Sequence, residues 1–396
     1  MSQQTIAIED RHTPPFFRKI PVAIERGEGI YVWDEEDNRY IDFTSGWGVT
    51  CLGHASPVIT QALTEQSKKI IQNPSSGLTY APARARLLSL LTSLLPTNLS
   101  RIFFASSGAE ANDAVIKLAR KVTGRLNVIA SLKGFHGRTI STASATGQAK
   151  HREKFNPLMP NYSFVPYNDI EAMRRAMDEQ VAAVLLEPIQ GEGGVNAPLP
   201  GYLEDVSRLC QENGSCLIID EVQTGFCRTG SMFAIDGLDI KVDFLTMAKG
   251  IAGGFPFGAF AIDEAVAARL EQGDHGGTYC GNPLGCAVAY AVISYLQDNR
   301  IADHVRQMGA YILGRLQALQ GQYPERIKAV RGRGLLLAAE MADPETAARL
   351  YRHCLEHRLF VNLTQETVIR LFPALNITPV EADEGLALFA EALAGL

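Results

Sequence analysis

Lys249 is the first residue whose type and position could do chemistry. It follows the apolar run of residues 243–247 and precedes a glycine-rich stretch. A lysine at a strand end, with little charge nearby, is easily desolvated, which lowers its pKa and makes its amine a nucleophile able to form a Schiff base. A lone lysine in such a place is more often a surface residue at a turn, so Lys249 needs a second group beside it.

Asp220 is that second group, because it follows another apolar run, residues 216–219. Ligands of open α/β sheets bind outside the carboxyl ends of the strands, where an acid can hold a cationic ring nitrogen or a Mg²⁺ ion. A nucleotide hydrolase, the magnesium alternative, needs a G-x-x-x-x-G-K-[ST] phosphate loop, which this sequence lacks. Asp220 precedes Lys249 by 29 positions. We therefore expect one strand–helix–strand step between them and both side chains in one crevice.

Residues 105–110, ASSGAE, lie where an apolar run gives way to a helical pattern. Free N–H groups and the helix dipole favour a phosphate there, and Gly108 lets the backbone approach closely. Ser107 with a glutamate three residues later is also a capping box, which is compatible with phosphate binding. A second glycine-rich loop, residues 275–282, contains Thr278, whose hydroxyl could contact a phosphate.

Arg370 lies inside the apolar run VIRLF, so its guanidinium needs a partner. The pattern leaves two interpretations open: Arg370 faces water at a sheet edge, or it holds a carboxylate. His353 and His357 have metal-like spacing, but they lie on a predicted amphipathic helix without a second ligand cluster, so we predict no metal site.

The composition is that of a globular protein, with 46% hydrophobic and 20% charged residues among 396. The formal charge of −6 is spread along the chain, which argues against a nucleic acid or an anionic membrane as partner. The sequence shows neither a membrane span nor a signal-peptide pattern. The seven cysteines are odd in number and scattered, which indicates free thiols in a reducing compartment, so we expect a cytoplasmic protein.

The elements that must position these groups alternate from about residue 100. Strands are predicted over residues 101–105, 125–130, 181–186, 216–219, 243–247 and 257–262. Helical spacing marks residues 109–122 and 202–213. Strands this apolar, alternating with helices, predict an α/β fold whose mostly parallel sheet is covered on both faces.

After residue 290 the pattern changes to long predicted helices followed by short predicted strands, which indicates a smaller α+β domain. Its predicted helices are residues 285–296 and 302–319, and its predicted strands are residues 334–340, 359–363 and 368–372. An early hairpin over residues 29–43 has no partners of its own, so we place it with this domain. We therefore predict an N-terminal segment, 1–50, that packs with the small domain, a large domain, 51–285, and a small domain, 286–396.

Seven sequence blocks occur together in the order of one family. They are SSGAEAN at 106–112, GFHGRT at 134–139, EPIQGEGGV at 187–195, DEVQTGFCRTG at 220–230, AKGIAGGFP at 248–256, GGTYCGNP at 276–283 and IRLFPALNIT at 369–378. From about residue 33 onward the chain resembles the class III, or ornithine-type, aminotransferases, which use pyridoxal 5'-phosphate. It is closest in texture to the acetylornithine enzymes, while ornithine and 4-aminobutyrate aminotransferases share most blocks. The resemblance implies the PLP-transferase fold type I, with a large domain around a mostly parallel sheet and a smaller α+β domain.

The resemblance also implies roles at the cofactor. Lys249 would form the Schiff base and move the substrate's proton, and Asp220 would pair with the pyridine nitrogen. Phe135 and Val222 would pack the two ring faces, and Gln223 would bond the phenolic oxygen. The remaining implied cofactor contacts are Ser107, Gly108, Ala109, His136 and, from a neighbouring subunit, Thr278. The last of these implies a homodimer with shared active sites.

Substrate roles follow from the same resemblance. Arg370 would grip the α-carboxylate of glutamate or 2-oxoglutarate in two parallel hydrogen bonds, and Glu192 would pair with it when a different substrate is bound. Arg138 would hold a carboxylate of the amino donor, or be a structural arginine of its loop. Trp47 and Tyr80 lie in segments that build the donor pocket of the family, and both segments depart from the acetylornithine pattern.

The leading hypothesis is a ping-pong aminotransferase that moves an amino group from an ω-amine, acetylornithine- or ornithine-like, to 2-oxoglutarate. An ω-amine:pyruvate transaminase would use Arg370 differently or leave it paired with Glu192. An aminomutase would need no 2-oxo acid acceptor. A non-catalytic binding protein on this fold would have lost Lys249 or Asp220, and both are present.

Overall fold

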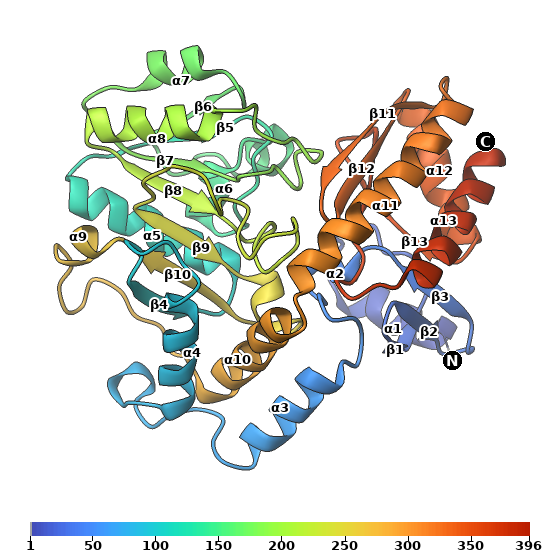
Figure 1. The fold of residues 1–396 in the computed structure, drawn as a ribbon, viewed down its shortest axis with the longest axis horizontal. Coiled ribbons are helices and arrows are strands. Elements are labelled where there is room, and N and C mark those ends of the chain that lie inside the picture. The colour runs from blue at the N-terminus through green and yellow to red at the C-terminus, as the bar shows by residue number, and fades with distance from the viewer. Residues whose placement is uncertain (1) are drawn as a thin grey trace.

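The computed structural model describes residues 2–396, and its strands form three sheets over that range. The largest sheet lies between helices in one half of the molecule, and two smaller sheets lie in the other half with both chain ends (Figure 1). The two halves meet along the inner ends of the large sheet's strands, where the candidate residues gather.

The large sheet has the strand order β4-β10-β9-β8-β7-β5-β6. Its strands are β4 (Arg101–Ala105), β5 (Asn127–Ser131), β6 (Tyr162–Val165), β7 (Val181–Leu186), β8 (Cys216–Asp220), β9 (Phe244–Met247) and β10 (Gly258–Ile262). Only β10 runs antiparallel to its neighbours, so the predicted mostly parallel sheet is confirmed. Every residue of β7 is buried, as the continuous apolar run predicts.

Both faces of this sheet are covered, because neighbouring residues of one strand enter different clusters. Ile218 packs in the cluster that contains Val115 of α5 (Gly108–Thr123), whereas Ile219 packs in the cluster that contains Val206 of α8 (Tyr202–Asn213). These two helices match the predicted helical ranges to within one residue. The alternation of strand side chains thus requires a helix on each face.

The other helices lie beside the large sheet or in the half of the molecule that holds the two small sheets (Figure 1). They are α1 (Ser2–His12), α2 (Ser45–Gly48), α3 (Pro57–Ser67), α4 (Pro82–Thr92), α6 (Ile140–Ala145), α7 (Ile170–Ala176), α9 (Glu264–Ala267), α10 (Pro283–Asp298), α11 (Ile301–Gln322), α12 (Pro344–Glu356) and α13 (Pro379–Ala394). Helix α10 packs against α3 and α4. Between residues 2 and 396 no helix has the length and apolar character that a membrane crossing needs.

The predicted helix between Asp220 and Lys249 is wrong. Residues 221–243 run from β8 to β9 through turns, with no helix among them. The segment contains three glycines and lacks helical apolar spacing, and its Phe226 and Cys227 adopt positive φ angles of 56° and 69°. Strands β8 and β9 nevertheless pair in parallel, with Asp220 opposite Thr246, so the expected shared crevice forms by another route.

The predicted early hairpin forms and joins the C-terminal part of the chain. Strands β1 (Ile24–Glu28), β2 (Tyr31–Asp34) and β3 (Arg39–Asp42) are antiparallel neighbours, and β3 also pairs with β13 (Leu359–Phe360). The hairpin therefore contacts the C-terminal segment through the pairing of β3 with β13. The division of the chain at residues 50 and 285 stays a prediction.

The second small sheet has the order β11-β12-β15-β14 and is antiparallel. Its strands are β11 (Ile327–Arg333), β12 (Leu336–Met341), β14 (Asn362–Thr364) and β15 (Val368–Leu371). The single strand predicted over residues 359–363 is in fact two short strands, β13 and β14, in different sheets. Val361 between them is buried, so the apolar run continues while the hydrogen-bonding partner changes.

Candidate active site

A cavity of about 450 Å³ lies where the parallel strands of the large sheet end. Loops that follow β4, β5, β7, β8 and β9 all contribute to its wall. Ligands of open α/β sheets bind outside this edge. The predicted site residues that line the cavity are Ser107, Gly108, Ala109, Phe135, His136, Arg138, Glu192, Asp220, Val222, Gln223 and Lys249.

Four predicted site residues do not line the cavity. Arg370 is fully buried behind Glu192. Trp47 is 52% exposed and packs against Phe17, with ring centroids 6.0 Å apart. Tyr80 and Thr278 are exposed on loops away from the cavity of their own chain. One chain alone therefore does not bring all the predicted residues together.

Helix α5 begins at the cavity. Ser107 is its N-cap and accepts a hydrogen bond from the Glu110 N–H at 3.2 Å, while Glu110 Oε2 accepts from the Ser106 N–H at 2.7 Å. The predicted capping box therefore forms in part: the Glu110 carboxylate accepts from the Ser106 N–H and not from the N–H of the N-cap residue, Ser107. A Cβ on Gly108 would lie 2.8 Å from the Val222 side chain, so glycine keeps the helix start close to the cavity wall. The first N–H groups of this 16-residue helix form an anion-binding end.

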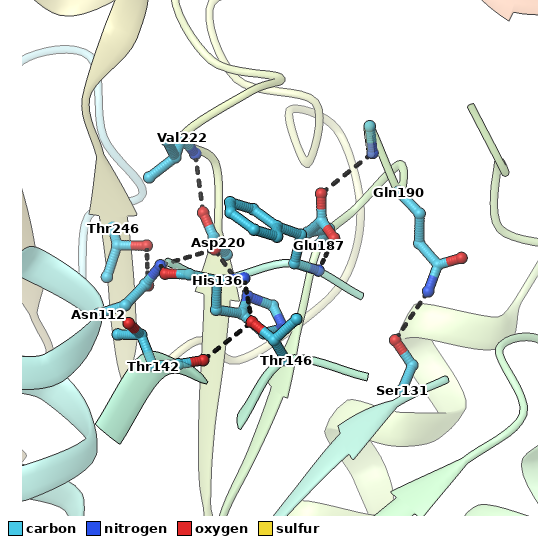
Figure 2. Close-up of polar contacts among 12 residues, drawn as sticks. Asn112, Ser131, His136, Thr142, Thr146, Glu187, Gln190, Asp220, Val222 and Thr246 are labelled. Carbon is cyan, nitrogen blue, oxygen red and sulfur yellow. Dashed lines mark hydrogen bonds and ion pairs between the residues drawn. The ribbon is translucent and has the colours of Figure 1, made fainter. Parts of the chain in front are cut away.

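Asp220 is held by three groups in the cavity floor (Figure 2). Its Oδ2 accepts from Asn112 Nδ2 at 2.8 Å and lies 2.8 Å from His136 Nδ1, and its Oδ1 accepts from the Val222 N–H at 3.0 Å. Thr246 in turn donates to Asn112 Oδ1 at 2.8 Å. The carboxylate is therefore fixed in direction before any ligand binds, and His136 contacts it directly.

Asn112 is a residue that sequence reasoning missed, although it ends the block SSGAEAN. It is buried within α5, and its Nδ2 also donates to the His136 carbonyl at 2.9 Å. A buried amide must find hydrogen-bond partners, and an asparagine is unfavourable in a helix interior. An asparagine among the apolar positions of the predicted helix was the available signal.

Lys249 follows β9 and begins a short 3₁₀ helix, Lys249–Ala252, with a φ of 47°. A positive φ in a residue other than glycine is costly and often marks a functional position. Its Nζ donates to Gln223 Oε1 at 2.6 Å. Burial lowers the pKa of Lys249, with Arg370 acting in the same direction and Glu192 opposing it. A lowered pKa leaves more of the amine unprotonated and nucleophilic.

Arg370 lies on β15 between β12 and β14, so it does not face water at a sheet edge. Its Nη2 donates to Glu192 Oε1 at 2.6 Å, and Asn362 Oδ1 accepts from its Nε and Nη2 at 2.8 and 2.6 Å. Burial alone would raise the pKa of Glu192, but Arg370 and Lys249 outweigh burial and lower it. Sequence reasoning missed Asn362, which has no feature in its own segment to mark it.

The cavity fits a phosphorylated, cationic aromatic ring. Asp220 offers a fixed carboxylate to a ring nitrogen, and Phe135 and Val222 offer apolar walls. Gln223 Nε2 is buried without a hydrogen-bond partner among residues 2–396, so it has a donor free for a ring oxygen. Lys249 supplies the amine. Together with the start of α5, these groups match the charge and the shape of pyridoxal phosphate.

Comparisons with known proteins support this assignment. The family model described as "Aminotransferase class-III" matches residues 14–393. The acetylornithine aminotransferase of Methanothermobacter thermautotrophicus is 42% identical over 396 residues, and the match covers all of both chains. A solved structure of the acetylornithine aminotransferase of Elizabethkingia anophelis has a TM-score of 0.87 and 31% identity, covering 100% of this chain and 99% of that one.

The cofactor is supported by a second solved structure. An ornithine aminotransferase from Toxoplasma gondii has a TM-score of 0.93 and 31% identity, covering 100% of this chain and 95% of that one, and is described with partial occupancy of PLP at its active site. The family recognised from the seven blocks and the predicted fold are thus both confirmed. This chain belongs to the class-III aminotransferases and is a pyridoxal-phosphate-dependent transaminase.

Proposed function

We propose that this transaminase moves the amino group of an acetylornithine- or ornithine-like ω-amine to 2-oxoglutarate in two half-reactions of a ping-pong cycle. The carrying observation is the Arg370–Glu192 ion pair beside the cavity, with its 2.6 Å contact. The names of the relatives, acetylornithine and ornithine aminotransferases, support the donor class.

Two residues carry the proton chemistry. Bound pyridoxal phosphate supplies a cationic ring that withdraws electrons from the substrate's amine-bearing carbon. Asp220 holds a proton on the pyridine nitrogen, since its carboxylate is fixed toward the cavity by Asn112. Lys249 would take the proton from the substrate's amine-bearing carbon and deliver it to the cofactor carbon bonded to the same nitrogen, because its lowered pKa keeps the amine available as a base.

The Arg370–Glu192 pair lets one pocket accept two substrates of different charge. One pocket must accept a dicarboxylate in one half-reaction and a neutral or cationic arm in the other. Leaving a buried guanidinium unpaired in the second case would be costly, and Glu192 removes that cost. When 2-oxoglutarate enters, Glu192 moves aside and Arg370 binds the α-carboxylate through two of its N–H groups, one of them on Nη1, which has no partner in the described chain.

Replacing Arg370 with alanine should damage the glutamate half-reaction far more than the donor half-reaction. A lost charge-assisted bidentate contact costs about 2–5 kcal/mol, or about 30- to several-thousand-fold in kcat/KM for glutamate. The two half-reactions are followed separately by the cofactor's absorbance in single turnovers. Arg370→Lys is the matched control, because it keeps the charge, loses the planar fork and should fall between the wild type and Arg370→Ala.

Four results would contradict this acceptor. Equal slowing of both half-reactions by Arg370→Ala, or slowing of neither, would make Arg370 structural. Turnover of the wild type with pyruvate in preference to 2-oxoglutarate would favour the ω-amine:pyruvate alternative. Turnover with no 2-oxo acid at all would favour the aminomutase.

Donor recognition is proposed to involve Arg138 and Trp47. Arg138 lines the cavity, with its guanidinium carbon 5.6 Å from the centre of the Phe135 ring, and can meet a donor carboxylate. Trp47 lies two residues before Val49, which lines the cavity, and its backbone has a strained φ of 67°. We propose that the bulky Trp47 indole, so near Val49 in the chain, limits the size of the donor's distal group.

The functional unit is proposed to be a homodimer with shared sites. Thr278 lies outside the cavity of its own chain, and its carbonyl accepts from Gln72 Nε2 and Ser76 Oγ, both at 2.5 Å. Exposed apolar side chains surround this loop: Leu78 is 88% exposed, and Tyr80 is fully exposed. A second copy would bury these side chains and bring Thr278 and Tyr80 to a neighbouring cavity.

Mixing Thr278→Ala chains with Lys249→Ala chains tests the shared site. Each mixed dimer has one doubly damaged site and one intact site. At limiting cofactor, the mixture should therefore exceed the summed activities of the two parent proteins. Thr278→Ser, which keeps the hydroxyl, is the control and should need no complementation. A catalytically competent monomer in sedimentation would contradict the dimer.

A cytoplasmic location is also proposed, because the cysteine thiols are not joined in disulfides. All seven cysteines are buried and free of disulfides. Unpaired cysteines are typical of reducing compartments. Measuring free thiols in protein purified without reductant, together with fractionation of the producing cells, tests this placement.

A further inference from the structure

Glu187 is a buried acid in the cavity wall to which the proposed function gives no role. It follows β7 directly, is 4% exposed and lines the cavity with Phe135, Glu192 and Lys249. Buried carboxylates are costly unless they are hydrogen-bonded. The contacts that hold Glu187 therefore indicate what it does.

Its two oxygens accept from two different loops (Figure 2). Oε1 accepts from the Phe135 N–H at 3.0 Å, and Oε2 accepts from the Gly191 N–H, also at 3.0 Å. Phe135 is the proposed ring-stacking residue, and Gly191 directly precedes Glu192, the proposed partner of Arg370. One carboxylate thus joins the cofactor wall to the segment that carries Glu192.

The segment around Glu192 is held from its other side by the small domain. Thr364 Oγ1 and Gln365 Nε2 both donate to the Glu192 carbonyl at 2.9 Å. The Glu192 main chain is therefore fixed between two anchors, Glu187 in the large domain and these two side chains in the small one. With its backbone held in this way, Glu192 can swing its side chain off Arg370 without the loop itself shifting.

We propose that Glu187 is a positioning residue whose carboxylate clamps the Phe135 wall and the Glu192 loop together, and that protonation of Glu187 loosens the clamp. An ionised carboxylate accepts through both oxygens, whereas a carboxylic acid turns one oxygen into an O–H donor that faces an N–H donor. The inference rests on the roles proposed above for Phe135 and Glu192.

The protonation change falls in the neutral range. Burial raises the pKa of Glu187 to about 7, with Asp220 adding to the rise and His136 opposing it. Lys249 also faces the carboxylate across the cavity, and the Tyr167 hydroxyl donates to the Glu187 carbonyl at 3.0 Å. The pKa is raised, so Glu187 is mostly protonated at pH 6 and mostly ionised at pH 8. The clamp is therefore complete at pH 8 and weakened at pH 6.

Amide hydrogen exchange in the cofactor-free protein tests the clamp without using activity. Mass spectrometry of peptides covering residues 134–137 and 189–193 gives the protection of both amides relative to their intrinsic rates at each pH. In the wild type, protection should fall about tenfold or more from pH 8 to pH 6, the value of a hydrogen bond to a charged group. In Glu187→Gln, protection should be low at both pH values.

Glu221→Gln is the matched control. Glu221 is equally buried, and burial also raises its pKa to about 7, but it bonds Thr224 and the Ile235 N–H and does not line the cavity. The Glu221→Gln variant should therefore show the same amide exchange as the wild type at both peptides. Unchanged protection in Glu187→Gln, or an equal loss in Glu221→Gln, would overturn the proposal, and neither result depends on the substrate.

A second readout separates positioning from general structure. In the holoenzyme, the pH profile of kcat/KM for the glutamate half-reaction should lose its step near pH 7 in Glu187→Gln and keep it in Glu221→Gln. If Glu187→Gln does not fold, Glu187→Asp replaces it, because the shorter acid keeps the charge but reaches only one of the two amides. A wild-type profile and wild-type protection in Glu187→Asp would also overturn the clamp.

Discussion

Lys249→Ala is expected to abolish turnover while leaving the protein folded and able to bind its cofactor. The variant loses both the attacking amine and the base that moves the substrate proton, since no other described lysine lines the cavity. General acid–base catalysis alone is worth about 10²–10⁴-fold, and the lost nucleophile adds to that. We therefore expect kcat to fall by at least about 10⁴-fold. Asp220, Gln223 and the start of α5 remain to hold the cofactor.

The measurement is steady-state transamination together with the visible absorbance of the bound cofactor. An added small alkylamine should restore part of the rate if Lys249 acts as a mobile base, because such an amine can enter the 450 Å³ cavity. Lys68→Ala, at the exposed C-terminal end of α3, is the control and should behave as the wild type. Wild-type turnover in Lys249→Ala would refute the assigned role.

Asp220→Asn is the second change with a large expected effect. An amide can still accept from Asn112 or Val222, so the fold of the site should survive. It cannot hold the ring nitrogen protonated, so the ring withdraws electrons less strongly. Breaking a buried ion pair costs about 3–5 kcal/mol, or a loss of about 10²–10⁴-fold in the rate of either half-reaction.

Single-turnover kinetics with each substrate measure this loss directly. Asp243→Asn is the matched control, since Asp243 is another buried acid of the same sheet region that accepts from the Leu217 N–H at 2.8 Å and does not line the cavity. Its effect should be confined to stability, measured by denaturant unfolding. Equal rates for the wild type and Asp220→Asn would count against pairing with the ring nitrogen.

The stability readouts need no cofactor, so they separate folding from chemistry. Asp220→Asn and Asp243→Asn both remove one buried charge, and both should unfold in a single comparable transition. Only the first should change the half-reactions. That contrast identifies Asp220 as a residue of the reaction rather than of the fold.

The sequence alone predicted six of the seven strands of the large sheet, their mostly parallel arrangement, and the meeting of Lys249 and Asp220 at one edge of it. The run of residues 181–186 and the helix over residues 202–213 are recognisable because burial on both faces, or on one helical stripe, leaves a local periodic pattern. Lys249 and Asp220 could be paired in advance, because parallel strands all end at one edge. The helix predicted between them is wrong. The two residues still meet, because parallel strands end at the same edge whatever route the chain takes between them.

Only the tertiary structure decided which side chains complete the site. Asn112 meets Asp220 and Glu187 meets Phe135 through hydrogen bonds between residues far apart in the sequence. Asn362 orients Arg370 from the neighbouring strand of the small sheet. The position of Tyr80 and Thr278 outside the cavity of their own chain is likewise set by how whole elements pack. Periodicity reports whether a residue is buried, but the identity of its neighbour depends on how whole elements pack. Hydrogen bonds between distant segments therefore leave no local pattern in the sequence.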